Sequence, residues 1–268
     1  MNRTVQSFFA KEKIEYFTSL DYTCCKELRP DIIARRGILP RSVIIFLLPY
    51  YSGEAKNISL YAVSKDYHIA IKDITDRLIE ELKVEYPENN FFGFGDHSPI
   101  DERHAAAIGG LGIIGANRLL INEKYGSYVF IAEVITDLAP SILGACKPLP
   151  IIHCDGCGAC NDACPTKSLA GFGECLSSVT QRKGELSDRE VELMKKHGTV
   201  WGCDVCQKVC PHNAAPILTP IEFFHTDRID HLTPAALDSM SEKSFSERAY
   251  SWRGRKTVER NLEKLEQH

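Results

Sequence analysis

The stretch "HCDGCGACNDACPTKSL", residues 153–169, decides the character of the second half of this chain. Its four cysteines follow the spacing Cys-x2-Cys-x2-Cys-x3-Cys-Pro. A second run that also ends in Cys-Pro, "WGCDVCQKVCPHN", occupies residues 201–213. This is the bacterial ferredoxin pattern, in which three thiolates hold one 4Fe-4S cluster and the fourth reaches a second cluster. The two runs predict a small domain built around two clusters.

The second cysteine run lacks its first member, and Cys175 is the obvious replacement. The crossed ligand rule then gives Cys154, Cys157, Cys160 and Cys210 for one cluster, and Cys164, Cys175, Cys203 and Cys206 for the other. Zinc is the alternative, because it also takes four thiolates from paired Cys-x2-Cys motifs. It needs neither the third cysteine at the next step nor the two Cys-Pro endings. The pattern therefore favours clusters.

Composition is that of an ordinary soluble globular protein: 268 residues, 44% hydrophobic, 25% charged and a formal net charge of -4. No apolar run approaches the roughly 20 residues of a membrane helix, and the N-terminus lacks the apolar core of a signal peptide. We therefore expect a cytoplasmic protein without a membrane partner, whose cysteines are ligands rather than disulfides. Cys24, Cys25 and Cys146 have no ligand spacing and are expected to be small buried hydrophobes.

The elements before the cysteine runs alternate between strand and helix patterns. We predict strands over 40–51 and 90–96, helices over 65–87 and 98–108, and two strands within 117–136 joined by a turn at Lys124–Gly126. The predicted fold class is α/β (α+β). The predicted domains are an α/β domain over residues 1–140, a ferredoxin-like double-cluster domain over 141–215, and a helical tail over 216–268.

Three features of the first domain have competing interpretations. Asp96 ends a predicted strand, where it could cap the next helix or act as a proton donor, and the sequence leaves both open. "GLGIIG" at 110–115 matches the dinucleotide pattern, but here helix precedes it and strand follows, the reverse of the required order. Tyr67 and His68 begin the predicted helix, where such a pair is usually part of the core or the surface.

Several segments together carry a family resemblance: "SKDYH" (64–68), "GDHSPIDER" (95–103), "GGLGIIGAN" (109–117), "YGSYVFIAEVIT" (125–136), "CLSSVTQRKG" (175–184) and "SWRGRKTVERN" (251–261). With the cysteine framework, the chain resembles the epoxyqueuosine reductases. These are cobalamin-dependent enzymes with two 4Fe-4S clusters that reduce epoxyqueuosine to queuosine in tRNA.

The resemblance implies an oxidoreductase whose first domain helps to hold a cobalamin, with Asp96 as the catalytic proton donor. Electrons would come from an external ferredoxin or flavodoxin. The implied cofactor-binding residues, besides Asp96, are Ser59, Tyr67, His68, Asn117, Leu120, Ile131, Ser177 and Lys183. The implied basic rim toward tRNA comprises Lys183, Arg253, Lys256 and Arg260.

The sequence also departs from that family. The family's "GKN" turn reads "GAN" here, with Ala116 in place of the lysine, and the helical-repeat domain that usually follows is not present before His268. One alternative therefore keeps the cofactors and takes a small-molecule substrate. Two others involve no turnover: a two-cluster electron carrier, and a cobalamin-handling protein.

Overall fold

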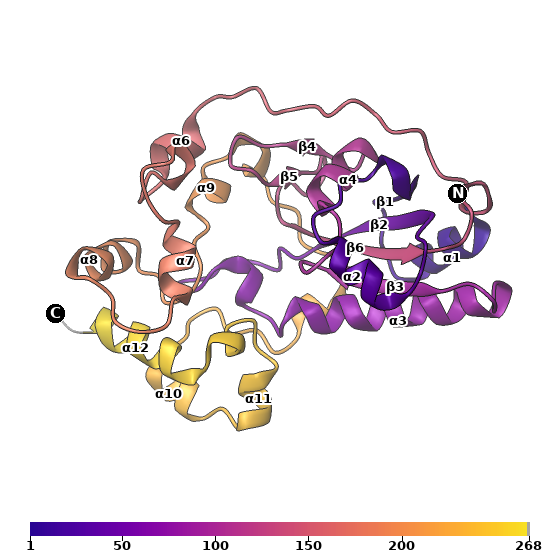
Figure 1. Cartoon of the computed structure of the whole chain (residues 1–268). Coiled ribbons are helices and arrows are strands. Elements are labelled where there is room, and N and C mark those ends of the chain that lie inside the picture. The colour runs from indigo at the N-terminus through magenta and orange to yellow at the C-terminus, as the bar shows by residue number, and fades with distance from the viewer. Residues whose placement is uncertain (267–268) are drawn as a thin grey trace. The chain divides into compact units, whose positions relative to one another are not determined.

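The computed structural model describes residues 1–266, and these form two compact units (Figure 1). The first unit combines residues 1–49 with 68–156, and the second combines residues 50–67 with the chain from Cys157 onward. This division differs from the domains predicted at 140 and 215. Segment 50–67 belongs with the cysteine region because it pairs there, as in the bridge between Ile58 and Trp201.

The first unit is built on a four-stranded antiparallel sheet in the order β1-β2-β6-β3. The strands are β1 (Phe17–Asp21), β2 (Ser42–Pro49), β3 (Phe91–Gly95) and β6 (Val129–Thr136). Every residue of β2 is buried, which explains its unbroken apolar sequence. A separate two-stranded sheet pairs β4 (Ile113–Ile114) with β5 (Leu120–Ile121).

Helices cover both faces of the main sheet. Ile45, Ile131 and Ile135 pack in one cluster with residues of α2 (Pro30–Arg36) and α4 (Glu102–Ile108). Helices α1 (Arg3–Lys11) and α3 (Tyr67–Glu85) take the opposite face. A Cβ on Gly93 would lie 2.5 Å from Thr75 Oγ1, so β3 needs glycine where α3 lies directly on the strand.

These elements confirm the predicted strands at 40–51 and 90–96 and the predicted helices at 65–87 and 98–108. The two strands predicted within 117–136 also exist, but they join different sheets: β5 pairs with β4, whereas β6 lies between β2 and β3. The predicted α/β class holds in the coarse sense of a mixed fold around a small antiparallel sheet.

The second unit consists of short helices connected by long loops. They are α6 (Ala159–Ala163), α7 (Leu176–Gln181), α8 (Asp188–His197), α9 (Val205–Lys208), α10 (Pro234–Asp238), α11 (Glu242–Ser246) and α12 (Arg255–Glu266), while α5 (Pro140–Leu143) lies in the first unit. Trp201 and Tyr250 are fully buried at its core. Asn261 of α12 donates to the carbonyl oxygens of Thr180 and Val200 at 2.7 and 2.8 Å, which ties the last helix to the cysteine region. Within residues 1–266, no helix is long and apolar enough to cross a membrane.

Candidate functional site

Three thiols of the first predicted ligand set lie near one another in the second unit, beside α6. Cys160 interacts electrostatically with Cys157 and Cys210. The fourth member, Cys154, belongs to the first compact unit, where its Sγ accepts a hydrogen bond from the Ala116 N–H at 3.2 Å. Three of the four side chains are therefore neighbours within one unit, although Cys210 lies far along the chain.

The second predicted set gathers around α9. Cys203 interacts with Cys175 and Cys164, and Cys206 interacts with Cys203, Cys175 and also Cys160 of the first set. Cys175, which the sequence offered only as a replacement, therefore lies among the members of its predicted set. Burial raises the pKa of Cys203 to about 11 and that of Cys206 to about 12, so both thiols lose their protons only when a metal competes for them.

Cys164 differs from its neighbours. Burial raises its pKa, but hydrogen bonds from Ser168 and from the backbone N–H groups of Leu169 and Thr166 outweigh that effect and lower the pKa to about 7. Such donors stabilise a thiolate, as a cluster ligand requires. Among the unassigned cysteines, Cys146 is exposed, with its Sγ 3.2 Å from Thr18 Oγ1, so the expectation that it is buried was wrong.

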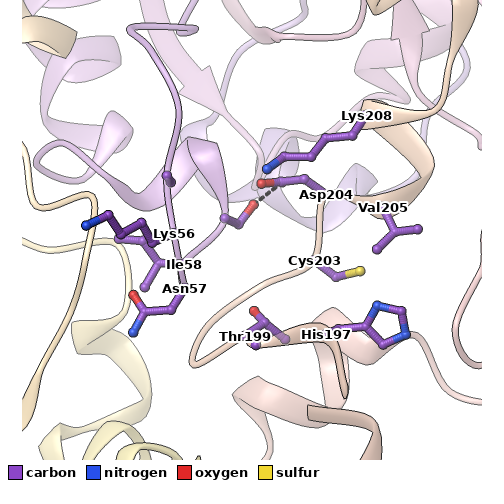
Figure 2. A pocket seen from close by; sticks show the side chains of 12 residues that line it. Lys56, Asn57, Ile58, His197, Thr199, Cys203, Asp204, Val205 and Lys208 are labelled. Carbon is purple, nitrogen blue, oxygen red and sulfur yellow. Dashed lines mark hydrogen bonds between the residues drawn. The ribbon is translucent and has the colours of Figure 1, made fainter. Parts of the chain in front are cut away.

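A pocket of about 130 Å³ opens beside Cys203 in the second unit (Figure 2). It is lined by residues 55–59, 197–199 and 203–205 and by Lys208. Burial, followed by the charge of Lys196, lowers the pKa of His197, so that imidazole is neutral at neutral pH. The pocket gives small solutes access to one predicted cluster ligand.

Asp204 is among the residues that line this pocket and is 8% exposed. Its carboxylate accepts a hydrogen bond from the Ser59 hydroxyl, the dashed line at Asp204 in Figure 2, and another, at 2.7 Å, from the Leu60 N–H. Gly202 beside it has φ +76°, and a Cβ there would lie 2.4 Å from the Ser59 Cβ. Ser59, predicted to contact the cofactor, thus has a structural partner in the loop that carries Cys203.

Asp96 lies on the turn that follows β3 and adopts a left-handed backbone with φ +64°. It does not cap the next helix: the N-cap of α4 is Asp101, whose side chain accepts from the His104 N–H at 3.2 Å. The capping interpretation of Asp96 is therefore wrong. Its Oδ2 lies 3.9 Å from His68 Nε2, and both side chains are exposed. A strained non-glycine residue of this kind is typical of functional sites.

Two further carboxyl groups lie behind Asp96. The Asp96 N–H donates to Glu102 Oε2 at 3.1 Å. Burial first, and then the charge of Asp96, raises the pKa of Glu102 to about 7. Glu133 of β6 is fully buried, and burial together with the charge of Glu102 raises its pKa to about 8. Sequence analysis missed both residues. A lone acid in the apolar strand "VFIAEVIT" was the available signal for Glu133.

The remaining predicted cofactor residues fall into different environments. Asn117 is 7% exposed and its Nδ2 has no hydrogen-bond partner within the described residues, so a bound group could satisfy it. Ser177 is half-buried and accepts from Gln181 at 2.9 Å. Leu120 and Ile131 are buried in the core cluster of the first unit. The Tyr67 ring packs edge-on against Tyr61.

The glycine-rich segment 109–115 turns the chain from α4 into β4. Helix precedes strand, which confirms the order that argued against dinucleotide binding. A Cβ on Gly112 would lie 2.5 Å from the Ile121 carbonyl oxygen, and one on Gly115 would lie 2.3 Å from Asn117 Oδ1. These glycines therefore allow close packing of the chain against itself.

Fewer basic side chains are available to a ligand than the predicted basic rim contains. The Arg260 guanidinium donates to the Arg182 carbonyl oxygen at 2.8 Å and also to that of Gly184. Lys183 and Lys256 are exposed. The Arg253 guanidinium lies 3.7 Å from the ring centre of Trp252, whose side chain is exposed. Two lysines and a stacked Arg–Trp pair thus remain for a ligand.

Comparison with known proteins agrees with these features. A "4Fe-4S double cluster binding domain" family model matches residues 153–213, and the model "Epoxyqueuosine reductase QueG, DUF1730" matches residues 38–96. The chain is thus an iron–sulfur protein of the double-cluster class. It is 35% identical to an epoxyqueuosine reductase of Leadbetterella byssophila over 225 residues, which cover 78% of this chain and 72% of the relative. The chain belongs to the epoxyqueuosine reductase family, and its relatives are oxidoreductases.

Solved structures share the fold. An epoxyqueuosine reductase of Bacillus subtilis, described with its catalytic aspartate loop swung out of the active site, superposes with a TM-score of 0.76 at 21% identity, covering 98% of this chain and 79% of that one. An epoxyqueuosine reductase with an epoxyqueuosine-modified tRNA-Tyr stem loop superposes with a TM-score of 0.73 at 23% identity, covering 97% and 80%.

The crossed ligand sets predict selective cluster loss. Anaerobically prepared protein should hold about eight iron and eight sulfide ions. Cys210→Ser and Cys206→Ser should each lose about half of them, because each removes one ligand of a different cluster. Cys146→Ser, outside both sets, is the control and should retain the full content. Iron and sulfide analysis with EPR of the reduced protein checks this, and stoichiometric zinc without sulfide would contradict it.

The raised pKa of Glu133 predicts a pH-dependent stability. Its neutral form is favoured in the folded state, so this stabilisation is complete below the ordinary glutamate pKa and is lost as pH rises toward about 8. Glu133→Gln should therefore raise stability on the order of 2–4 kcal/mol above that range and change it little at about pH 5. Thermal unfolding at both pH values measures this, with exposed Glu88→Gln as the control. An equal effect at both pH values would contradict it.

Proposed function

We propose that this protein reduces epoxyqueuosine to queuosine in tRNA. The observation that carries the proposal is the 35% identity to an epoxyqueuosine reductase across 72% of that relative's length. A solved relative described with an epoxyqueuosine-modified tRNA stem loop supports tRNA as the carrier of the substrate. Opening the epoxide to an alkene consumes two electrons and two protons and releases water. The site must therefore supply both electrons and protons.

Electrons would enter from an external carrier of the ferredoxin or flavodoxin type and pass along two 4Fe-4S clusters held by the eight cysteines. Cobalamin would, when bound, supply the two-electron reducing chemistry at the epoxide. The orphaned Asn117 amide in the first unit fits a bound polar group of this kind.

Asp96 would supply a proton to the epoxide oxygen as the carbon–oxygen bonds break. Its exposed carboxyl group, held on a strained turn at the end of β3, can reach a substrate outside the sheet. His68, whose Nε2 lies 3.9 Å from Asp96 Oδ2, would return a proton to it from solvent. The catalytic aspartate loop named for the Bacillus subtilis relative supports this assignment.

A second candidate keeps the cofactors and changes the substrate to a small molecule. The observation that favours it is the inward use of Arg260, which weakens the predicted basic rim. An assay on tRNA bearing epoxyqueuosine, with cobalamin and a strong reductant, separates the candidates. Turnover supports the tRNA substrate. Cobalamin binding without turnover of this tRNA contradicts it and leaves the small-molecule enzyme or a cobalamin-handling protein. Failure to bind cobalamin favours an electron carrier.

Asp96→Asn tests the proton donor. Asparagine keeps the size of aspartate and tolerates the left-handed backbone, but it cannot donate as an acid. Turnover should fall by about 10²–10⁴, the usual worth of general acid catalysis, while cluster content stays unchanged. Asp101→Asn is the matched control, because asparagine caps a helix as well as aspartate does, and it should remain near wild type. Wild-type turnover of Asp96→Asn would move the donor role to another group, with adjacent His97 the first to test.

The small basic rim predicts weak, salt-sensitive binding of tRNA. Two to four phosphate contacts would give affinity near the non-specific range, about 10⁻⁴–10⁻⁶ M, with a salt slope of roughly 0.7–0.9 per phosphate. Arg253→Ala with Lys256→Ala should reduce both affinity and slope, whereas Lys72→Ala on α3 should not. A salt titration of tRNA binding measures this. Tight binding that ignores salt and these substitutions would place the RNA surface elsewhere.

A further inference from the structure

The two carboxyl groups behind Asp96 have no part in the proposed chemistry so far. Both belong to the first unit, and they come from different elements: Glu102 begins α4, and Glu133 lies in the middle of β6. Glu133 is fully buried and Glu102 is half-buried, and placing two interacting acids in such surroundings is costly unless at least one of them stays protonated.

Glu133 lies on the face of the sheet that α4 covers. Along β6, Glu133 shares a face with Ile131 and Ile135, which pack in the cluster that contains α4. Both of its carboxyl oxygens lack a partner at hydrogen-bond geometry within the described residues, although Ser98 comes close enough to lower its pKa somewhat. An acid without strong donors in an apolar layer keeps its proton.

Unlike Glu133, Glu102 has a hydrogen-bond donor at its carboxyl group. Its Oε2 accepts the Asp96 N–H at 3.1 Å, and this contact fixes the one residue of the turn with a left-handed backbone. The charged groups around Glu102 are Asp96, Arg103 and Asp101. Those around Glu133 are Glu102 from α4 and, from the segment after β1, the titratable side chains of Tyr22 and Cys25.

We propose that Glu102 is a positioning residue for Asp96, because its carboxylate fixes the aspartate's strained backbone. Of the two acids, Glu133 is the one that keeps a proton. A charged acceptor binds an N–H more strongly than a neutral one. Ionised Glu102 therefore holds the turn, and protonated Glu102 loosens it. This inference deepens the proposed function, since it assigns a control over the proposed proton donor.

Hydrogen exchange at the Asp96 amide tests the contact without any turnover. In cofactor-loaded protein, Glu102→Ala should speed exchange in a peptide spanning residues 92–98 by roughly tenfold to a hundredfold, the worth of a hydrogen bond to a charged group. Glu102→Gln keeps an acceptor that does not titrate. After correction for intrinsic rates, wild-type protection should increase as pH rises through neutrality, and in Glu102→Gln this step should vanish.

Infrared spectroscopy tests the proton on Glu133. Wild-type protein at neutral pH should show a carbonyl band of a protonated carboxyl group, and Glu133→Gln should remove it. Glu102→Gln should move the titration of that band to lower pH, because the neighbouring negative charge is gone. Glu88→Gln, an exposed glutamate, should leave the band and the exchange unchanged.

Unchanged protection in Glu102→Ala, or a pH step that persists in Glu102→Gln, would overturn the positioning role. Absence of the protonated band would overturn the role of Glu133. These results are independent of the proposed reaction. If Asp96→Asn turns over like wild type while Glu102→Ala still releases the turn, the proposed donor fails and the positioning contact stands.

Discussion

The loop that carries Cys203 and Cys206 is tied to residues 50–67 through one buried carboxylate, that of Asp204. Short loops that carry thiol ligands bury little apolar surface of their own, so contacts from elsewhere must hold them. Asp204 supplies such a contact, because it accepts from Ser59 and Leu60 of a segment more than a hundred residues earlier. The result explains why residues 50–67 leave the sheet unit and join the second compact unit.

The first unit uses a different constraint, the close approach of helices to an antiparallel sheet. Glycine at position 93 lets α3 lie directly on β3, and the first residue after that strand, Asp96, adopts a left-handed conformation. The same sheet buries Glu133 beneath α4. Packing of helices on the sheet therefore accounts for the glycine at position 93 and for the burial of Glu133.

Sequence patterns predicted the elements whose signal is local. Strand β2 is a continuous apolar run, and α3 has a regular apolar stripe, so both follow from periodicity alone. The double-cluster region followed from cysteine spacing and agrees with the matching family model. The N-cap of α4 was not assigned from the sequence, because Asp96 and Asp101 both precede the helix. Only the folded backbone shows that Asp101 is the cap.

By itself, then, the sequence determined the cysteine framework, strands β2, β3 and β6, helices α3 and α4, and the family, because each is encoded by residues close together along the chain. Tertiary structure alone decided that Asp204 reaches Ser59, that Arg260 turns inward to backbone carbonyls, and that Glu133 lies beneath Glu102. Each of these contacts joins segments distant in sequence. Their energies depend on burial and on the neighbouring charge, which exist only once the chain has folded.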